Sequence, residues 1–120
     1  MLRVERTIRV RSMIAVIFEV WPAEGRREDY FDLAGALRPE LEKIDGFLSI
    51  ERFGSLAEDG KLLSLSFWRD EDSVKRWRTQ LEHRAAQVKG RGGIFKDYRL
   101  RVASVIRDYG MFEREQKPKD

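Results

Sequence analysis

The residues of this 120-residue chain best suited to acid–base chemistry are a single histidine, an arginine among glycines and a carboxylate in an apolar stretch. His83 titrates near neutral pH without any environmental shift, so it is the first candidate for a general base or proton shuttle, with a surface histidine as the alternative. Arg91 either stabilises an anionic substrate group or satisfies the last carbonyls of a helix. Glu19 is costly to bury alone, so we interpret it as a base with a raised pKa or as one half of a salt bridge across a dimer.

Aromatic side chains supply the candidate binding surface. Trp68 and Trp77 could form the walls of a pocket for a planar substrate, although tryptophans at this spacing also serve as core. Tyr98 and Tyr30 are candidate hydrogen-bond donors at the pocket edge, with packing as the alternative role. Gln87 lies on the flank of the predicted helix that carries Trp77, so we count it among the substrate-binding candidates.

Composition argues against several other kinds of site. The chain has no cysteine, which excludes disulfides, thiolate metal sites and a cysteine nucleophile, and its one histidine does not support a zinc site, so we predict no metal. The formal net charge of +3 is concentrated in residues 1–12, and no basic stripe with interleaved aromatic residues follows, so we predict no nucleic-acid partner. No apolar run is as long as a membrane span and no signal-peptide pattern is present, so we predict no membrane association and a cytoplasmic location.

Apolar periodicity predicts the elements that position these residues. Residues 13–21 form a strand that is apolar on both faces apart from Glu19, so both faces should be covered. A helix follows, which Pro39 should bend without ending, and Asp45 and Gly46 stop it. The apolar stripe of this helix consists of Tyr30, Leu33, Ala34, Leu37, Leu41 and Ile44.

The second half of the chain is predicted to form a hairpin of two strands, then a helix and a last strand. Residues 47–53 and 62–68 are predicted strands, residues 70–73 carry the N-cap chemistry of a second helix, and glycines at 90, 92 and 93 end it. The stripe of this helix is Val74, Trp77, Leu81, Ala85 and Val88. His83 lies almost opposite the stripe if the helix is continuous, whereas a break near Gln80 would change its phase. Residues 98–107 alternate as a last strand.

The order strand, helix, strand, strand, helix, strand predicts an α+β, ferredoxin-like fold, an antiparallel sheet with both helices on one face. The other face would then be bare, and a second copy of the sheet is its simplest cover, which predicts a homodimer. We divide the chain into a flexible extension (1–12), a ferredoxin-like domain (13–109) and a charged tail (110–120) that we expect to be mostly disordered.

Two groups of motifs extend this interpretation. One is Phe67-Trp68-Arg69-Asp70-Glu71-Asp72-Ser73, then Trp77, Glu82-His83, Ala86-Gln87, Gly90-Arg91, and Tyr98 with Arg101-Val102-Ala103. The other is Ile44-Asp45-Gly46-Phe47-Leu48-Ser49-Ile50-Glu51-Arg52. Together they make residues 13–109 resemble the antibiotic biosynthesis monooxygenase family of dimeric α+β barrels.

The resemblance implies a homodimer with one pocket per subunit between sheet and helices. There a small aromatic or quinone-precursor molecule would be oxidised by molecular oxygen without metal, flavin or other cofactor. Haem-degrading relatives carry a histidine ligand where this chain has Gln87 and an asparagine near the place of Glu19, and the chain has no asparagine, which argues against haem. The alternative function is a non-catalytic dimeric module that binds a small molecule in the same cavity, because the chain offers few catalytic groups.

Overall fold

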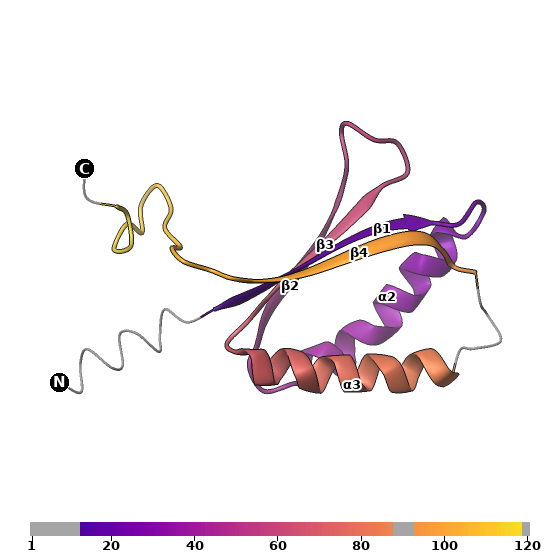
Figure 1. Ribbon diagram of the computed structural model, residues 1–120, viewed down its shortest axis with the longest axis horizontal. Helices are drawn as coiled ribbons and strands as arrows, with labels where there is room; N and C mark the ends of the chain where they lie inside the picture. The colour runs from indigo at the N-terminus through magenta and orange to yellow at the C-terminus, as the bar shows by residue number, and fades with distance from the viewer. Residues whose placement is uncertain (1–12, 88–92, 119–120) are drawn as a thin grey trace.

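The computed structural model describes the backbone of residues 13–87 and 93–118, and the side chains of residues 13–80 and 93–118. The elements in chain order are β1 (Ile14–Pro22), α2 (Arg27–Glu42), β2 (Phe47–Gly54), β3 (Leu62–Trp68), α3 (Glu71–Gln87) and β4 (Phe95–Ser104). The strands form one sheet in the order β2-β3-β1-β4, and every neighbouring pair is antiparallel. Both helices lie on one face of this sheet (Figure 1). The predicted α+β, ferredoxin-like fold is therefore confirmed.

The strand registers sort the side chains onto two faces, because residues directly opposite each other on antiparallel strands point the same way. Val16 and Val20 of β1 lie in the core with residues of α2, so they mark the helix side. On β4 the helix side carries Tyr98, Leu100 and Val102, which pair with Val20, Phe18 and Val16. We call the other side of the sheet the open face. It carries Ala15, Ile17 and Glu19 of β1, Glu51 of β2, Leu63, Leu65 and Phe67 of β3, and Arg99 and Arg101 of β4.

Two clusters of buried side chains join the helices to the sheet. The first consists of Val16, Leu41, Ile44 and Trp68, with Trp77 of α3 packed against it. The second consists of Val20, Tyr30, Leu62 and Ile94. Both clusters include β1 and the segment of residues 30–44, so these two segments form the packing centre of the domain.

The helix α2 forms because its apolar residues recur at helical spacing, and Tyr30, Ala34, Leu37 and Leu41 are buried as that spacing predicts. Pro39 lies inside the helix, which continues to Glu42. The prediction that this proline does not end the helix is confirmed. Asp45 and Gly46 follow, and Gly46 adopts the left-handed backbone conformation, with a φ of 97°, that favours glycine.

Beyond β4 the chain leaves the body of the domain (Figure 1). Residues 105–118 have no helix or strand, and a few hydrogen bonds join residues within this segment. The Gly110 N–H donates to the Glu113 carbonyl over 2.7 Å, and the Arg114 guanidinium donates back to the Gly110 carbonyl over 3.0 Å. The expected N-terminal extension, residues 1–12, lies outside the described residues.

Candidate functional site

An apolar surface lies exposed on the helix side of β4, where core residues would ordinarily be covered. Tyr98 is 57% exposed, and Leu100 and Val102 are each 48% exposed. These residues point toward the helix layer, but β4 is the edge strand beyond β1, and the two core clusters involve β1 and β3. We call Tyr98, Leu100 and Val102 the β4 apolar surface. Large apolar side chains left half exposed on the inner side of a domain are typical of a ligand site.

Aromatic rings close one end of the β4 apolar surface. The Phe18 ring lies 5.5 Å from the Tyr98 ring and 6.1 Å from the Phe95 ring, and Phe95 contacts Tyr98 at 6.0 Å. Behind them the buried Tyr30 ring lies 6.0 Å from Phe95 in an edge-on arrangement. Tyr98 is exposed, and its role as a hydrogen-bond donor stays a prediction, whereas Tyr30 is buried and packs against Phe95. Such rings can hold a planar, apolar ligand by edge and face contacts.

The two tryptophans have different roles. Trp68 is 0% exposed, and its indole N–H donates to the Ser66 hydroxyl over 2.9 Å. The prediction that Trp68 forms a pocket wall is therefore wrong, because its strand-end position places it in the core against Phe47. Trp77 is only partly buried and packs against the cluster that contains Val16. Val16 in turn pairs with Val102, so this cluster connects Trp77 to the β4 apolar surface.

Glu19 lies on the open face, away from the β4 apolar surface. Its carboxylate contacts the Lys61 ammonium at 2.8 Å and the Arg101 guanidinium at 2.6 Å. Hydrogen bonds from Lys61 and then from Arg101 lower the pKa of Glu19 below its usual range. The interpretation of Glu19 as a base with a raised pKa is wrong, because two cations of its own chain, Lys61 just before β3 and Arg101 on β4, stabilise the carboxylate.

The other predicted site residues fall where the structure gives no side-chain positions. His83 and Gln87 belong to α3, which is continuous through Gln80, so the break considered at that residue is absent. Their side chains, and Arg91 altogether, lie outside the described residues. Their predicted roles stay predictions.

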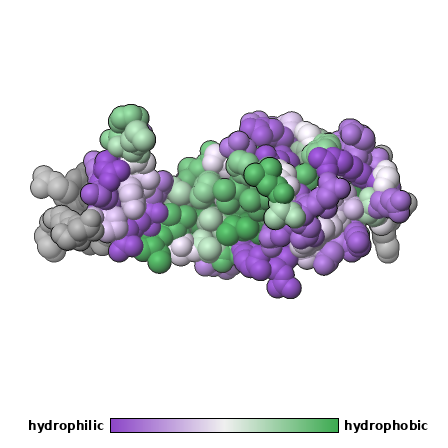
Figure 2. Space-filling model, turned by 90° about the horizontal axis from the view of Figure 1, so that it is seen from above, coloured by the Kyte–Doolittle hydropathy of each residue, from purple (hydrophilic) through white to green (hydrophobic). Residues whose placement is uncertain are grey.

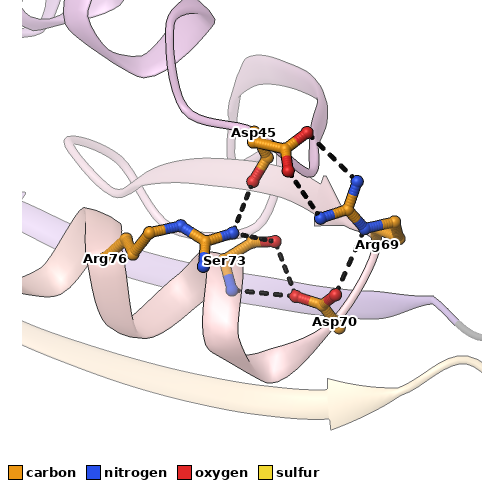
Figure 3. A network of polar contacts seen from close by, with 5 residues as sticks. All are labelled: Asp45, Arg69, Asp70, Ser73 and Arg76. Atoms are coloured by element: carbon orange, nitrogen blue, oxygen red, sulfur yellow. Dashed lines mark hydrogen bonds and ion pairs between the residues drawn. The ribbon is translucent and has the colours of Figure 1, made fainter.

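A network of ionic and hydrogen-bonding side chains holds the start of α3 (Figure 3). Arg69 donates to both carboxylate oxygens of Asp45, over 3.1 and 3.0 Å, and to Asp70 over 3.2 Å. Asp70 in turn accepts from the Ser73 backbone N–H at 2.9 Å and from the Ser73 hydroxyl at 2.6 Å, which is an N-cap arrangement. Arg76 donates to the Asp45 carbonyl over 2.8 Å. We call Asp45, Arg69, Asp70, Ser73 and Arg76 the corner network.

Charge and hydrogen bonding stabilise the ionised forms within the corner network. The two bonds from Ser73 and the nearby Arg69 lower the pKa of Asp70 to about 2. The bond from Arg69 likewise lowers the pKa of Asp45. The two carboxylates raise the pKa of Arg69 in return. All three groups therefore stay charged over the physiological pH range.

Sequence reasoning missed Leu100, Val102, Phe18 and Phe95 as site residues. Their apolar alternation predicts inward-facing strand positions, and inward-facing positions are usually core. The edge position of β4 in the sheet exposes Leu100, Val102 and Phe95, and Phe18 of β1 is half-buried beside them. Local periodicity does not reveal the order of the strands in the sheet.

No group of acidic or histidine residues able to hold a metal occurs among the described side chains. Within the same residues, neither helix is long and apolar enough to cross a membrane. The described part of the site thus consists of apolar and aromatic side chains, with an ordered ionic corner at the start of the adjacent helix.

The comparison with known sequences finds two curated relatives. The chain is 53% identical, over 93 residues, to jasmonate monooxygenase ABM of the fungus Pyricularia oryzae; the match covers 78% of this chain and 43% of the relative. It is 41% identical, over 63 residues, to the uncharacterized protein YqjZ of Bacillus subtilis, covering 52% of this chain and 53% of that protein. The chain therefore spans about half the length of these relatives.

Solved structures share the fold at low sequence identity. Rv0793 of Mycobacterium tuberculosis superposes with a TM-score of 0.63 at 22% identity, covering 83% of this chain and 99% of that one. A mutant of SnoaB of Streptomyces nogalater, a cofactor-independent oxygenase, gives a TM-score of 0.63 at 12% identity, covering 80% and 95%. The family model for antibiotic biosynthesis monooxygenase matches residues 13–89, more than half of the chain. The chain therefore belongs to the antibiotic biosynthesis monooxygenase family.

Proposed function

We propose that the protein is a cofactor-independent monooxygenase that oxidises a small aromatic or quinone-precursor molecule bound on the β4 apolar surface. The observation that carries the proposal is the half exposure of Tyr98, Leu100 and Val102 on the helix side of the sheet. Membership of the monooxygenase family and the similarity to a fungal monooxygenase support the oxidation. The aromatic group of Phe18, Phe95 and Tyr98 favours a planar ligand.

The chemistry that fits this site draws its electrons from the substrate. A methylene group beside a carbonyl or an aromatic ring loses a proton, and the resulting carbanion passes an electron to molecular oxygen. The two radicals combine into a peroxide, which loses water as the carbon becomes a carbonyl. The methylene carbon gains one oxygen atom, the other leaves as water, and no external reductant is consumed.

The protein has three tasks in this reaction. An apolar surface excludes water from the carbanion and the oxygen, and this is the task of the β4 apolar surface. A base takes the first proton, for which His83 remains the candidate, and a cation stabilises the substrate anion, for which Arg91 remains the candidate. Trp77 and Gln87 are proposed to contact the ligand from α3.

Jasmonate is a second candidate substrate because the fungal relative that is 53% identical is named as a jasmonate monooxygenase. Jasmonate is a small carboxylate whose cyclopentanone ring carries a methylene beside the ketone. It therefore meets the same chemical requirement as an aromatic substrate such as anthrone.

Oxygen uptake tests the proposal. Purified protein treated with a metal chelator is mixed with anthrone or with jasmonic acid, and oxygen consumption is followed with an electrode. Activity on either compound should be accompanied by one atom of ¹⁸O in the product when ¹⁸O₂ is supplied. The variant His83→Ala should lower turnover about 100-fold. Tight binding of both compounds with neither consumed would instead favour the non-catalytic binding module.

We also propose that a second copy of the chain covers the open face. Figure 2 views the molecule from the side away from the helices, and an apolar area occupies the middle of it between hydrophilic areas. Ile17, Leu63, Leu65 and Phe67 lie on this face and are only half-buried in the single chain. An apolar sheet face of this kind is typical of a face-to-face interface between two sheets.

The charges at the two edges of the open face favour one orientation of the twofold axis that relates the two copies. One row across the sheet runs from Glu51 on β2 through Leu65 and Ile17 to Arg101 on β4. A twofold axis perpendicular to the strands would place Glu51 over Glu51. An axis parallel to the strands places β2 over β4 of the second copy, so that Glu51 meets Arg99 and Arg101. Electrostatic complementarity therefore favours the parallel axis.

A further inference from the structure

We propose that the contact between Gly46 and Ser73, held in place by the corner network, sets the angle between α3 and the sheet and thereby the width of ligand that the site accepts. The residues concerned are positioning residues, because they touch α3 and the turn after α2 and not the β4 apolar surface. The inference rests on the proposed function in one respect, the identification of the β4 apolar surface as the ligand site. The geometry that carries it is independent of any reaction.

The backbone of Gly46 and the side chain of Ser73 are in closer contact than any residue other than glycine would permit at position 46. A Cβ atom at Gly46 would lie 1.8 Å from the Ser73 hydroxyl oxygen, 2.8 Å from the Ser73 Cβ and 3.4 Å from an Arg69 nitrogen. Ser73 is fully buried, so its hydroxyl cannot rotate away into solvent. The absent side chain of Gly46 therefore determines how near α3 can approach the turn after α2.

The turn that contains Gly46 cannot move easily. Its carbonyl accepts the Arg69 backbone N–H at 2.7 Å, which ties the turn to the end of β3. The Phe47 N–H donates to the Ile44 carbonyl at 3.1 Å, and Ile44 is itself part of the first core cluster. Both sides of the turn are thus hydrogen-bonded to residues that adjoin or belong to the core.

The start of α3 makes few apolar contacts with the core. Among its described residues, Val74 and Trp77 are the ones that pack against the first core cluster. Ser73 and Trp77 are four residues apart, so they lie on the same side of the helix. A displacement at Ser73 is therefore transmitted to Trp77 and, through the cluster that contains Val16, toward Val102 of the β4 apolar surface.

The ionic part of the corner network locks this position. Arg69 binds the two oxygens of Asp45 side by side, an arrangement that fixes direction as well as distance. Arg76, one turn into α3, donates to the Asp45 carbonyl. The same aspartate thus holds the end of β3 and the first turn of α3 at one relative angle (Figure 3).

The variant Gly46→Ala tests the proposal, with Gly60→Ala as the matched control. Gly46 and Gly60 both have positive φ, 97° and 81°, but no atom lies within 4 Å of a Cβ at Gly60. The control therefore has the backbone strain without the contact. In Gly46→Ala/Ser73→Gly, the glycine removes both serine atoms that lie within 3.0 Å of the new Cβ, so this double variant should return α3 to its original position.

The first readout is a distance that needs no activity. Because the chain has no cysteine, spin labels can be placed at Gln80→Cys on α3 and Lys96→Cys on β4, both exposed, in a sample diluted with unlabelled protein. Gly46→Ala should change the label-to-label distance by roughly 2 Å, since the label lies nearly two helical turns beyond the contact. Gly60→Ala should leave the distance unchanged, and the added Ser73→Gly should restore it.

The second readout is ligand width. Affinities for 1-naphthoate and 9-anthroate, with two and three fused rings, are measured by calorimetry, and their ratio should change about fivefold in Gly46→Ala and less than twofold in Gly60→Ala. A folded Gly46→Ala variant with an unchanged distance and an unchanged ratio would overturn the proposal.

Should that variant fail to fold, the label-to-label distance is measured in Asp45→Asn instead. This substitution should broaden the distance distribution, and an unbroadened distribution would overturn the proposal. Absence of oxygen uptake in the unmodified protein, with the distance shift present, would reject only the proposed function.

Discussion

At the scale of single residues, burial separates side chains of the same type. Trp68 and Trp77 look alike in the sequence, but the first is fully buried in the core and the second is only partly buried against it. Tyr30 and Tyr98 divide in the same way. The residue types can be read directly from the sequence, and the alternation along each strand predicts which face each side chain occupies. It could not predict which of them a helix covers, because coverage depends on the position of the strand in the sheet.

Replacement of Tyr98 by alanine should weaken ligand binding without unfolding the domain. The ring is more than half exposed, so its removal should cost less than about 1 kcal/mol of stability, whereas the loss of its contacts should reduce affinity about tenfold. Calorimetric titration with 9-anthroate and urea unfolding measure the two effects. Leu56→Ala, which truncates an exposed side chain in the β2–β3 turn, is the control and should change neither. Unchanged affinity in Tyr98→Ala would place the ligand elsewhere.

The pKa of Asp70 predicts a loss of stability in acid. Its folded-state pKa of about 2 lies below the ordinary 3.8, so the unfolded chain binds more protons between these values. The contribution is fully present above about pH 4 and is lost as the pH falls toward 2. Asp70→Asn keeps an N-cap side chain but has no charge to titrate, so its stability should fall less steeply over this window. Urea unfolding from pH 5 to pH 2 measures how the free energy of unfolding changes with pH in both proteins. Equal slopes would contradict the lowered pKa of Asp70.

At the scale of elements, the sequence predicted the order and type of every helix and strand because each has a clear period and a clear stop. The last strand ends at Ser104, before the predicted end at residue 107. Glu19 shows what periodicity cannot supply. Its partners Lys61 and Arg101 lie on or beside strands far along the chain, and only the pairing of β1 with β3 and β4 brings them within contact.

Replacement of Gly35 by alanine should stabilise α2. Gly35 lies inside the helix, is exposed, and has no atom within 4 Å of the place that an alanine methyl group would occupy. Alanine loses less conformational entropy than glycine on folding, so the free energy of unfolding should rise by about 0.5–1 kcal/mol. Thermal and urea unfolding measure the change. A decrease in stability would show that the backbone beside Pro39 departs from helical geometry.

At the scale of the whole molecule, the sheet presents two apolar surfaces with different expected occupants. The β4 apolar surface has aromatic rings at one end, as a planar small molecule requires. The open face is broad, and its edges carry opposite charge, as a second copy with β2 over β4 requires. A helix layer on one side and a second sheet on the other would together cover β1 on both sides, as its sequence predicts.

Reversing charge at the edges of the open face should weaken and then restore the dimer. Glu51→Arg would place like charges together and should raise the dimer dissociation constant about fivefold at low salt. Adding Arg99→Glu to the same chain should recover most of the loss. In the double variant the positive charge at position 51 of each copy again faces a negative charge at position 99 of the other. Sedimentation equilibrium at low and high salt measures both constants. If the double variant is weaker than the single one, the two edges do not meet.

The contact between Gly46 and Ser73 also has an evolutionary consequence. Two positions that exclude each other sterically cannot diverge independently, so homologues that keep this corner should change them as a pair. Where position 46 has gained a side chain, position 73 should have lost its own, or α3 should begin at a different place in the chain. Lineages that have made this exchange would have a differently tilted helix without any substitution on the ligand-binding surface. The diversity of molecules accepted by such a family would then be recorded partly at a turn that no ligand touches.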